Sequence, residues 1–154
     1  ARAEQGIPIN FMKTLKQLLA GRTRPLAVVA PGDTVFHALT VMAKHEVGAV
    51  LVLDGEQLVG IFSERDYARK IILQGKTSKE TQVSEIMSDK VAYVTPNVSL
   101  DECMALMTEK HFRHLPVLDD EGSVLGIISI GDLVKETISD QQFLIAQLEH
   151  YIAG

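Results

Sequence analysis

Cysteine and aromatic residues are scarce in this chain of 154 residues. It has one cysteine, no tryptophan and 5% aromatic residues. A single cysteine excludes an intramolecular disulfide, and Cys103 lies in an apolar helical pattern, so we interpret it as a small buried core residue. This cysteine usage is compatible with a reducing compartment, and we expect a cytoplasmic protein.

Long hydrophobic runs and dense basic clusters are also lacking. No apolar run approaches the roughly 18 residues that indicate a membrane span, so we expect no membrane contact. The net charge is -5, which argues against nucleic acid as the main partner. With 46% hydrophobic residues, the chain can still bury a core, as one compact domain or as two small, tightly joined halves.

The first residues show no pattern of either helix or strand. Residues 1–11 precede Met12, which would be a natural start, so we expect residues 1–11 to be a leader or a remnant. The segment lacks the long apolar stretch of a secretory signal. Residues 1–24 are therefore assigned to this leader and a short N-terminal helix.

One phrase occurs twice in the chain. Residues 60–67 read Gly-Ile-Phe-Ser-Glu-Arg-Asp-Tyr, and residues 126–133 read Gly-Ile-Ile-Ser-Ile-Gly-Asp-Leu. Each predicts the end of a buried strand, a Ser-x-x-Asp junction and the start of a helix. The two copies indicate an internal duplication.

The elements around this phrase are duplicated as well, at a spacing of about 65 residues. Each copy has a short apolar helical stripe, a short strand before a proline, a capped helix, and two strands joined by a turn. The expected ranges are 15–19, 26–30, 34–45, 49–53 and 58–62 in the first copy, and 83–87, 92–95, 99–107, 115–118 and 124–128 in the second. A helix from Glu64 to about Leu73 ends the first copy, and a helical region from Leu133 through Ile152 ends the second.

The duplication predicts an α/β fold of two repeats. We assign residues 25–80 to the first repeat, 81–140 to the second and 141–154 to a C-terminal helix. Because about 60 residues cannot bury much surface alone, the repeats should pack against each other with pseudo-two-fold symmetry. Each Ser-x-x-Asp would then face the interface or a cleft beside it.

This order of elements resembles the cystathionine β-synthase (CBS) domain pair, also called the Bateman module, from about Leu15 to Ile138. The features that support the resemblance are Val83-Ser84-Glu85-Ile86-Met87, the Thr95-Pro96 strand end, Arg113-His114-Leu115-Pro116-Val117 and both Gly-x-x-Ser-x-x-Asp phrases. Residues 64–70 and 129–135 also look like the small stand-alone bacterial CBS-pair proteins. The resemblance implies two clefts that bind adenine nucleotides, and a homodimer shaped as a flat disc with its helices facing the partner.

The paired Ser-x-x-Asp motifs have two interpretations that both remain open. Ser63 with Asp66, and Ser129 with Asp132, could each form a capping box that stabilises only the helix start. Alternatively, a carboxylate beside helix N–H groups can accept hydrogen bonds from a ribose diol, while the hydroxyl faces phosphate. The resemblance implies the second role, with Asp66 and Asp132 as ribose anchors.

An anionic nucleotide beside two carboxylates requires cations nearby. Arg65 lies in the first motif, and Arg113-His114 resembles the basic pair that reaches phosphates in nucleotide-binding CBS modules. The matching positions in the first repeat are Gly48 and Ala49, so we expect two unequal sites. By resemblance, the backbone of Ala27-Val28 and of Val91-Ala92 would contact adenine. The full set of expected nucleotide-binding residues is Ser63, Arg65, Asp66, Ser129, Gly131, Asp132, Arg113, His114, Ala27, Val28, Gly48, Ala49, Val91 and Ala92.

No pattern of catalytic residues is evident. A nucleophile elbow, a phosphate-binding P-loop and a dinucleotide fingerprint are absent from the sequence, and His111, His114 and Cys103 lack the spacing of a metal site. We therefore expect a sensor that binds AMP first, with NAD or ATP as further ligands, and that acts on an unknown effector protein without making or breaking bonds. A structural interaction module that docks a partner through residues 143–152 is the alternative. A small enzyme using Asp66 and Asp132 as acid and base is a third hypothesis.

Overall fold

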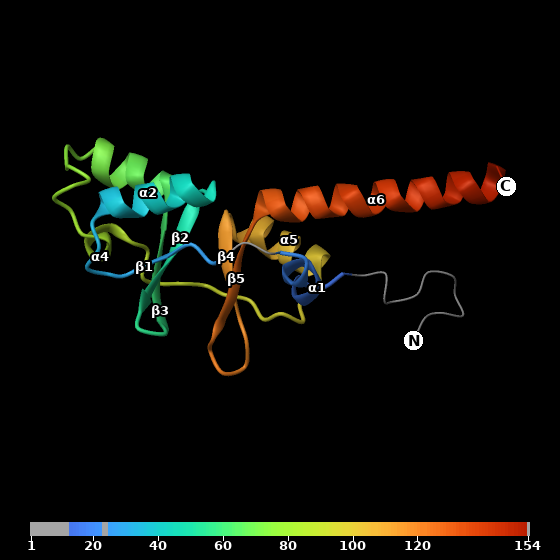
Figure 1. The fold of residues 1–154 in the computed structure, drawn as a ribbon, viewed down its shortest axis with the longest axis horizontal. Helices are drawn as coiled ribbons and strands as arrows, with labels where there is room; N and C mark the ends of the chain where they lie inside the picture. Colours follow the sequence, from blue (N-terminus) through green and yellow to red (C-terminus); the bar gives the residue numbers. More distant parts are fainter. Residues whose placement is uncertain (1–12, 23–24, 154) are drawn as a thin grey trace.

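The computed structural model describes residues 13–22 and 25–153 (Figure 1). The prediction of a leader at residues 1–11 lies outside these residues. Two small sheets stand side by side, each with its own helices and its own buried apolar cluster. The α/β architecture of two repeats predicted from the duplication is confirmed.

The first repeat is a three-stranded sheet flanked by helices. Strand β1 (Val28–Val29) runs parallel to β2 (Ala49–Asp54), which pairs antiparallel with β3 (Gln57–Ser63). Helix α2 (Val35–His45) begins at Thr34, whose side chain accepts a hydrogen bond from His37 N–H, as a cap should. After β3, α3 (Glu64–Asp66) continues into the π-helical η3 (Tyr67–Ile72), so the predicted helix is present but wider over its second part.

The second repeat follows the same plan with one difference. Helix α5 (Leu100–Lys110) begins at the capping box of Ser99 and Glu102, and β4 (His114–Leu118) pairs antiparallel with β5 (Val124–Ser129). The predicted strand over residues 92–95 is wrong, because only a single parallel bridge joins Val94 to Val117. The adjoining residues make no ladder, and Ala92 and Tyr93 are exposed.

The two short helices exchange places between the repeats. Helix α1 (Leu15–Ala20) precedes the first repeat in sequence but packs in the core of the second. Helix α4 (Val83–Ile86) precedes the second repeat but packs in the core of the first. Matching backbone bonds fix both helices, since Leu15 N–H donates to Val98 O at 2.9 Å and Val83 N–H donates to Asp33 O at 2.8 Å. Each short helix therefore lies on one side of residue 80 in the sequence and packs in the repeat on the other side of it.

Helix α6 (Ile130–Ala153) is one continuous helix of 24 residues. The boundary expected between residues 140 and 141 lies inside it. Its first turns cover the second repeat, where Leu133 is fully buried, and its remainder projects away from the two sheets (Figure 1). Lys13 holds the middle of the helix through an ion pair with Asp140 at 2.9 Å, and this contact raises the pKa of Lys13.

Candidate functional site

Two clefts open where the repeats meet, and each contains one Ser-x-x-Asp motif. The cleft around Ser129 and Asp132, here the Asp132 cleft, encloses about 390 Å³. The cleft around Ser63 and Asp66, here the Asp66 cleft, encloses about 880 Å³. Both volumes lie in the range of small-molecule sites in proteins.

Each cleft takes its wall from both repeats. Opposite Ser129 and Asp132 lie Ala27 and residues 45–49 of the first repeat. Opposite Ser63 and Asp66 lie residues 111–114 of the second. Because Gly48 and Arg113 occupy equivalent positions at the start of their strands, the arrangement is an approximate two-fold exchange of equivalent segments.

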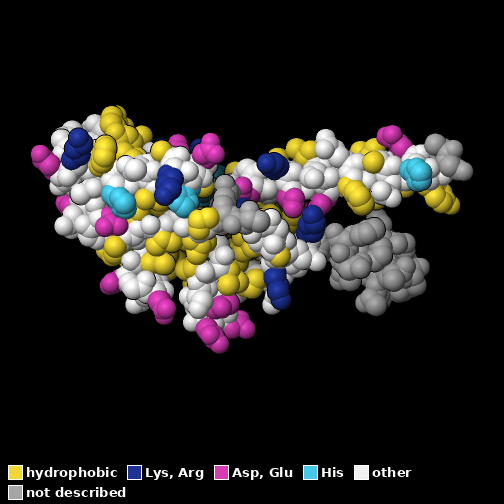
Figure 2. Space-filling model, in the orientation of Figure 1, with side chains coloured by type: hydrophobic (Ala, Val, Ile, Leu, Met, Phe, Trp, Pro, Cys, Tyr) yellow, Lys and Arg dark blue, Asp and Glu magenta, His cyan; other side chains and the backbone are white. Residues whose placement is uncertain are grey.

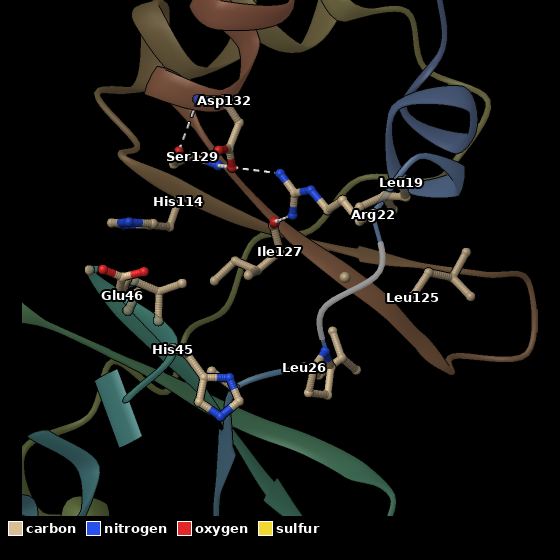
Figure 3. A pocket seen from close by; sticks show the side chains of 16 residues that line it. Leu19, Arg22, Leu26, His45, Glu46, His114, Leu125, Ile127, Ser129 and Asp132 are labelled. Atoms are coloured by element: carbon tan, nitrogen blue, oxygen red, sulfur yellow. Dashed lines mark hydrogen bonds and ion pairs between the residues drawn. The ribbon is translucent and has the colours of Figure 1, made fainter. Parts of the chain in front are cut away.

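In the Asp132 cleft, the motif forms a reciprocal cap at the start of α6. Ser129 N–H donates to Asp132 Oδ2 at 2.9 Å, and Asp132 N–H donates to Ser129 Oγ at 3.0 Å. Arg22 reaches the same carboxylate from the segment after α1 (Figure 3). Its Nη2 lies 2.7 Å from Asp132 Oδ2, and its Nη1 donates to Ile127 O at 2.7 Å.

These contacts determine the ionisation of Asp132. Burial alone would raise the pKa of this carboxyl, but the Ser129 N–H and the Arg22 guanidinium together outweigh burial and hold the pKa below its ordinary value. Asp132 is therefore an anion at neutral pH, and its charge is already balanced by Arg22. A ligand that binds here meets a neutral pair rather than a free carboxylate.

The Asp66 cleft contains the equivalent cap at the start of α3. Ser63 N–H donates to Asp66 Oδ2 at 3.0 Å, and Asp66 N–H donates to Ser63 Oγ at 3.2 Å. Lys70 lies one turn along, with its Nζ 3.4 Å from Asp66 Oδ1. Lys70 also donates to Ile86 O at 3.0 Å, so its ammonium is shared with the carboxyl end of α4.

The cations are distributed unequally. Arg65, Arg113 and His111 all line the Asp66 cleft. Within the part of the chain that the structure describes, neither arginine belongs to an ion pair. The sequence suggested that Arg65 belongs to the first half and Arg113 to the second, but the exchange of segments brings both to one cleft.

The difference in charge between the two clefts is increased by a pair of equivalent residues, both of which have a left-handed backbone conformation. Glu46 (φ 55°) ends α2 and lines the Asp132 cleft, whereas His111 (φ 59°) ends α5 and lines the Asp66 cleft. Such a conformation is uncommon for residues other than glycine and occurs often at functional sites. The same position in the repeat therefore adds an acidic residue, Glu46, to the Asp132 cleft and a histidine, His111, to the Asp66 cleft.

His114 lies on the boundary and lines both clefts. A Cβ atom at Gly48 would lie 3.5 Å from its Nε2, an ordinary contact distance, so the imidazole lies directly beside this glycine. Burial lowers the pKa of His114, and Arg113 lowers it further, while Asp132 and Glu64 oppose the change. The ring is thus mainly neutral at pH 7.

Most of the residues singled out from the sequence lie on a cleft. Ala27, Gly48, Ala49, His114, Ser129 and Asp132 line the Asp132 cleft; Ser63, Arg65, Asp66, Arg113 and His114 line the Asp66 cleft. Val28, Val91, Ala92 and Gly131 line neither. Sequence reasoning missed Arg22, Glu46 and the site role of His111. The signal for Arg22 was a basic loop with no assigned partner, and its carboxylate lies 110 residues away.

Two further observations concern the classes of function that were excluded from the sequence. Among the described residues, no helix combines the length and the apolarity needed to cross a bilayer. Across residues 13–22 and 25–153, no three His, Cys, Asp or Glu side chains are grouped so as to hold a metal ion.

A duplicated α/β unit with a capped carboxylate in each inter-repeat cleft defines a module of two structural repeats. The CBS domain profile matches residues 16–73 and 83–139 of this chain. The chain therefore belongs to the CBS domain family and contains two copies of the domain.

Related proteins agree with this assignment. A protein with CBS domains from Burkholderia ambifaria has a solved structure with a TM-score of 0.79 and 52% identity, covering 84% of this chain and 96% of that one. The CBS domain-containing protein YhcV of Bacillus subtilis is 34% identical over 119 residues, which is 77% of this chain and 84% of that protein.

A plant relative is longer than the matched region. The mitochondrial CBS domain-containing protein CBSX3 of Arabidopsis thaliana is 44% identical over 127 residues, which is 79% of this chain but 61% of that protein. The chain thus spans about three-fifths of that relative. Because that name places the relative in mitochondria, the cytoplasmic location stays a prediction for this chain.

Proposed function

We propose that this chain is a regulatory module that binds an adenine nucleotide in the clefts between its CBS repeats, with an AMP-like ligand first and ATP or NAD as further ligands. The observation that supports this most directly is the meeting of a capped carboxylate with two arginines in the Asp66 cleft. A carboxylate suits a ribose diol, and arginine suits phosphate. We further propose that the module passes its signal to an effector protein, whose identity the clefts do not specify.

In the Asp66 cleft, each part of a nucleotide would have a counterpart. Asp66 uses Oδ2 for Ser63 and approaches Lys70 only at 3.4 Å, so the carboxylate keeps acceptor sites for a ribose hydroxyl. Arg65 and Arg113 are exposed and able to turn towards phosphate. The phosphate charge would complete a cluster that otherwise has an excess of cations.

In the Asp132 cleft, we propose weaker binding and a preference for less charged ligands. Arg22 is already paired with Asp132, and Glu46 adds a second acid. A structure of the same fold at 23% identity, the CBS domain pair of protein MJ0100, was solved in complex with 5′-methylthioadenosine and S-adenosyl-L-methionine. Neither of those ligands carries a phosphate, so we include both as ligands for the Asp132 cleft.

The proposed mechanism needs no chemical step. A ligand in either cleft touches both repeats, so it would favour whichever arrangement of the repeats closes on it. Asp66 and Asp132 hold ribose hydroxyls in this scheme and transfer no proton. Turnover of a bound nucleotide would contradict this scheme and support the enzyme hypothesis.

Calorimetry tests the proposal with AMP, ATP, NAD, 5′-methylthioadenosine and S-adenosylmethionine. We expect micromolar or tighter binding of at least one phosphorylated ligand, weakened in an Arg65→Ala, Arg113→Ala double variant. Lys16→Ala and Lys110→Ala together make the matched control, because they remove the same charge outside both clefts. If the folded protein binds none of these ligands, the proposal is wrong.

A protein-interaction module without functional clefts is the second candidate. One observation favours it: the second half of α6 exposes large apolar side chains, among them Phe143 and Ile152. It predicts no nucleotide binding together with tight binding of a protein partner that depends on residues 143–152. The same calorimetry therefore separates the two candidates.

A further inference from the structure

The second half of α6 exposes apolar side chains along its length. Phe143, Leu144, Ile145, Leu148, Tyr151 and Ile152 are between 43% and 84% exposed. Figure 2 shows hydrophobic side chains on the projecting helix beyond the two sheets. A helix of 24 residues is about 36 Å long, and an apolar segment of it that packs on no other described element is marginal in water. An exposed apolar surface of this kind indicates an interface.

Six positions of α6 form a straight seam. Their spacing alternates strictly between four and three residues: Val134, Ile138, Gln141, Ile145, Leu148 and Ile152. All six are exposed. At about 100° per residue they stay within about 40° of one line along the helix, and Phe143 lies on the opposite face. This is the spacing of a two-stranded coiled coil.

We propose that this seam pairs with the same seam of a second copy of the chain, with the two helices antiparallel about a two-fold axis near residue 143. The register is self-complementary. Each layer then joins one residue to its counterpart on the other copy: Val134 to Ile152, Ile138 to Leu148, and Gln141 to Ile145. No layer lacks a counterpart, as a two-fold interface requires.

Charge decides the orientation of the pair. Lys135 and Glu149 flank the seam on the same edge, and the antiparallel register brings Lys135 of each copy beside Glu149 of the other. A parallel pair would instead place Lys135 near Ile130 and Glu149 near Leu144, without opposite charges. Gln141 costs stability in the seam but penalises shifted registers.

A second copy suits the surface better than a membrane does. The charged residues of α6 are mostly acidic, including Glu136, Asp140 and Glu149. Helices that bind anionic lipid surfaces are instead rich in Lys and Arg on their polar face. The homodimer expected from the family resemblance is thereby given a specific surface, which does not depend on nucleotide binding.

The native mass measured by light scattering tests the seam. We expect an assembly of the wild-type protein whose mass halves in an Ile145→Asp, Leu148→Asp double variant. A Phe143→Asp, Gln147→Asp double variant is the matched control, because it places the same two charges on the opposite face of the same helical segment and should leave the mass unchanged. Circular dichroism and thermal unfolding confirm that the sheets stay folded. A monomeric wild type, or equal masses in seam and control variants, would overturn the proposal.

A charge exchange tests the orientation. Lys135→Glu and Glu149→Lys should each raise the dissociation constant of the dimer about tenfold at low salt, since each turns two attractions into repulsions. The double variant should restore the wild-type value. An unrestored double variant would overturn the antiparallel arrangement.

Cross-linking gives a second measure of orientation. Ile138→Cys and Leu148→Cys chains should form disulfide-linked dimers only when mixed, because these positions face each other across copies. The native Cys103 is fully buried and should not compete. Disulfide dimers formed by either variant alone would indicate a parallel pair and overturn the proposal.

Discussion

The two clefts share one design and differ in charge. Both have a serine that ends a strand and an aspartate in the first turn of the next helix, joined by the same reciprocal hydrogen bonds. In the Asp66 cleft, the arginines remain available and the aspartate pairs with a lysine of its own helix. In the Asp132 cleft, the arginine is bound to the aspartate.

One source of the difference is the position four residues after each aspartate. Lys70 follows Asp66 by four residues, and the residue at the same distance after Asp132 is Glu136, which pairs with Lys13 at 3.4 Å. Among the described residues, Asp132 pairs with no cation of its own helix, and Arg22 supplies the positive charge from the segment after α1. Duplication kept the hydrogen-bonding frame, while changes at single positions altered the charge available to a ligand.

The largest expected effect is on ATP binding. Asp66→Ala should weaken the affinity for ATP about tenfold to hundredfold, because hydrogen bonds to a charged group contribute roughly 1.5–3 kcal/mol. Asp132→Ala should weaken it less. Calorimetry measures both, and Glu102→Ala is the control, since it removes a capping carboxylate outside both clefts. A larger loss in Asp132→Ala would reverse the proposed order of the clefts.

The second prediction concerns the equivalent glycines Gly60 and Gly126, of which Gly126 lines the Asp132 cleft. A Cβ at Gly60 would lie 2.5 Å from Met87 Sδ and 3.1 Å from the backbone oxygen of Ser88, whereas the nearest atoms to one at Gly126 would all belong to the Leu19 side chain, with Cδ2 at 2.7 Å. Ser88 is held by a bond from Ile61 N–H at 3.0 Å, but the leucine tip can rotate.

We therefore expect Gly60→Ala to reduce the free energy of unfolding by about 1–3 kcal/mol, and Gly126→Ala to reduce it less. Urea denaturation of both variants measures the difference. Gly32→Ala is the control, because a Cβ there meets nothing within 4 Å. Equal losses of stability in Gly60→Ala and Gly126→Ala would contradict this prediction, because they would show that the Ser88 backbone moves aside as easily as the Leu19 side chain.

The third prediction concerns the ion pair of the Asp132 cleft. Arg22→Gln should raise the pKa of Asp132 and lower the free energy of unfolding by about 1 kcal/mol at neutral pH, since the pair is partly exposed. A carboxyl whose folded pKa is depressed contributes stability above its unfolded pKa, near 4, and this contribution is lost as the pH falls through the folded value.

The stability difference between the wild type and Arg22→Gln should accordingly shrink as the pH falls below about 4. Chemical denaturation at a series of pH values measures it, with NMR titration of the Asp132 carboxyl as a direct readout. Lys16→Gln serves as a charge-matched control. A difference that stays constant with pH would show that Arg22 acts through packing alone.

The smallest expected effect is the pH dependence contributed by His114. Because burial lowers its pKa, the imidazole should be neutral at pH 7 and gain its charge only below the ordinary histidine value of about 6.5. Protonation would then strengthen phosphate binding by a few-fold between pH 7 and 5.5.

NAD is the probe for this effect, because its diphosphate bridge does not titrate in that range. His114→Gln should flatten the dependence of affinity on pH, and His37→Gln, outside both clefts, should not. If NAD affinity depends on pH equally in the wild type and in His114→Gln, the imidazole does not take part in binding.

Particular residues show how much was readable from the sequence. The duplicated Ser-x-x-Asp phrases predicted two caps and two sites, because a capping box depends on residues three apart. Thr34, Ser99 and the turns were readable for the same local reason. The strand predicted over residues 92–95 was wrong, because strand pairing depends on a neighbouring segment and only Val94 pairs with one.

The sequence by itself determined the repeat, the elements of each half and the residue types at the clefts, because these depend on periodicity and on contacts within one turn. Only the tertiary structure decided that α1 and α4 exchange repeats and that Arg113 lines the same cleft as Asp66. It also decided that Arg22 neutralises Asp132. Contacts such as Lys70 with Ile86 and Arg22 with Asp132 join residues that are 16 and 110 positions apart in the sequence. No local spacing of residues encodes such contacts. The two Ser-x-x-Asp motifs are alike in sequence, and their surroundings make the clefts unequal.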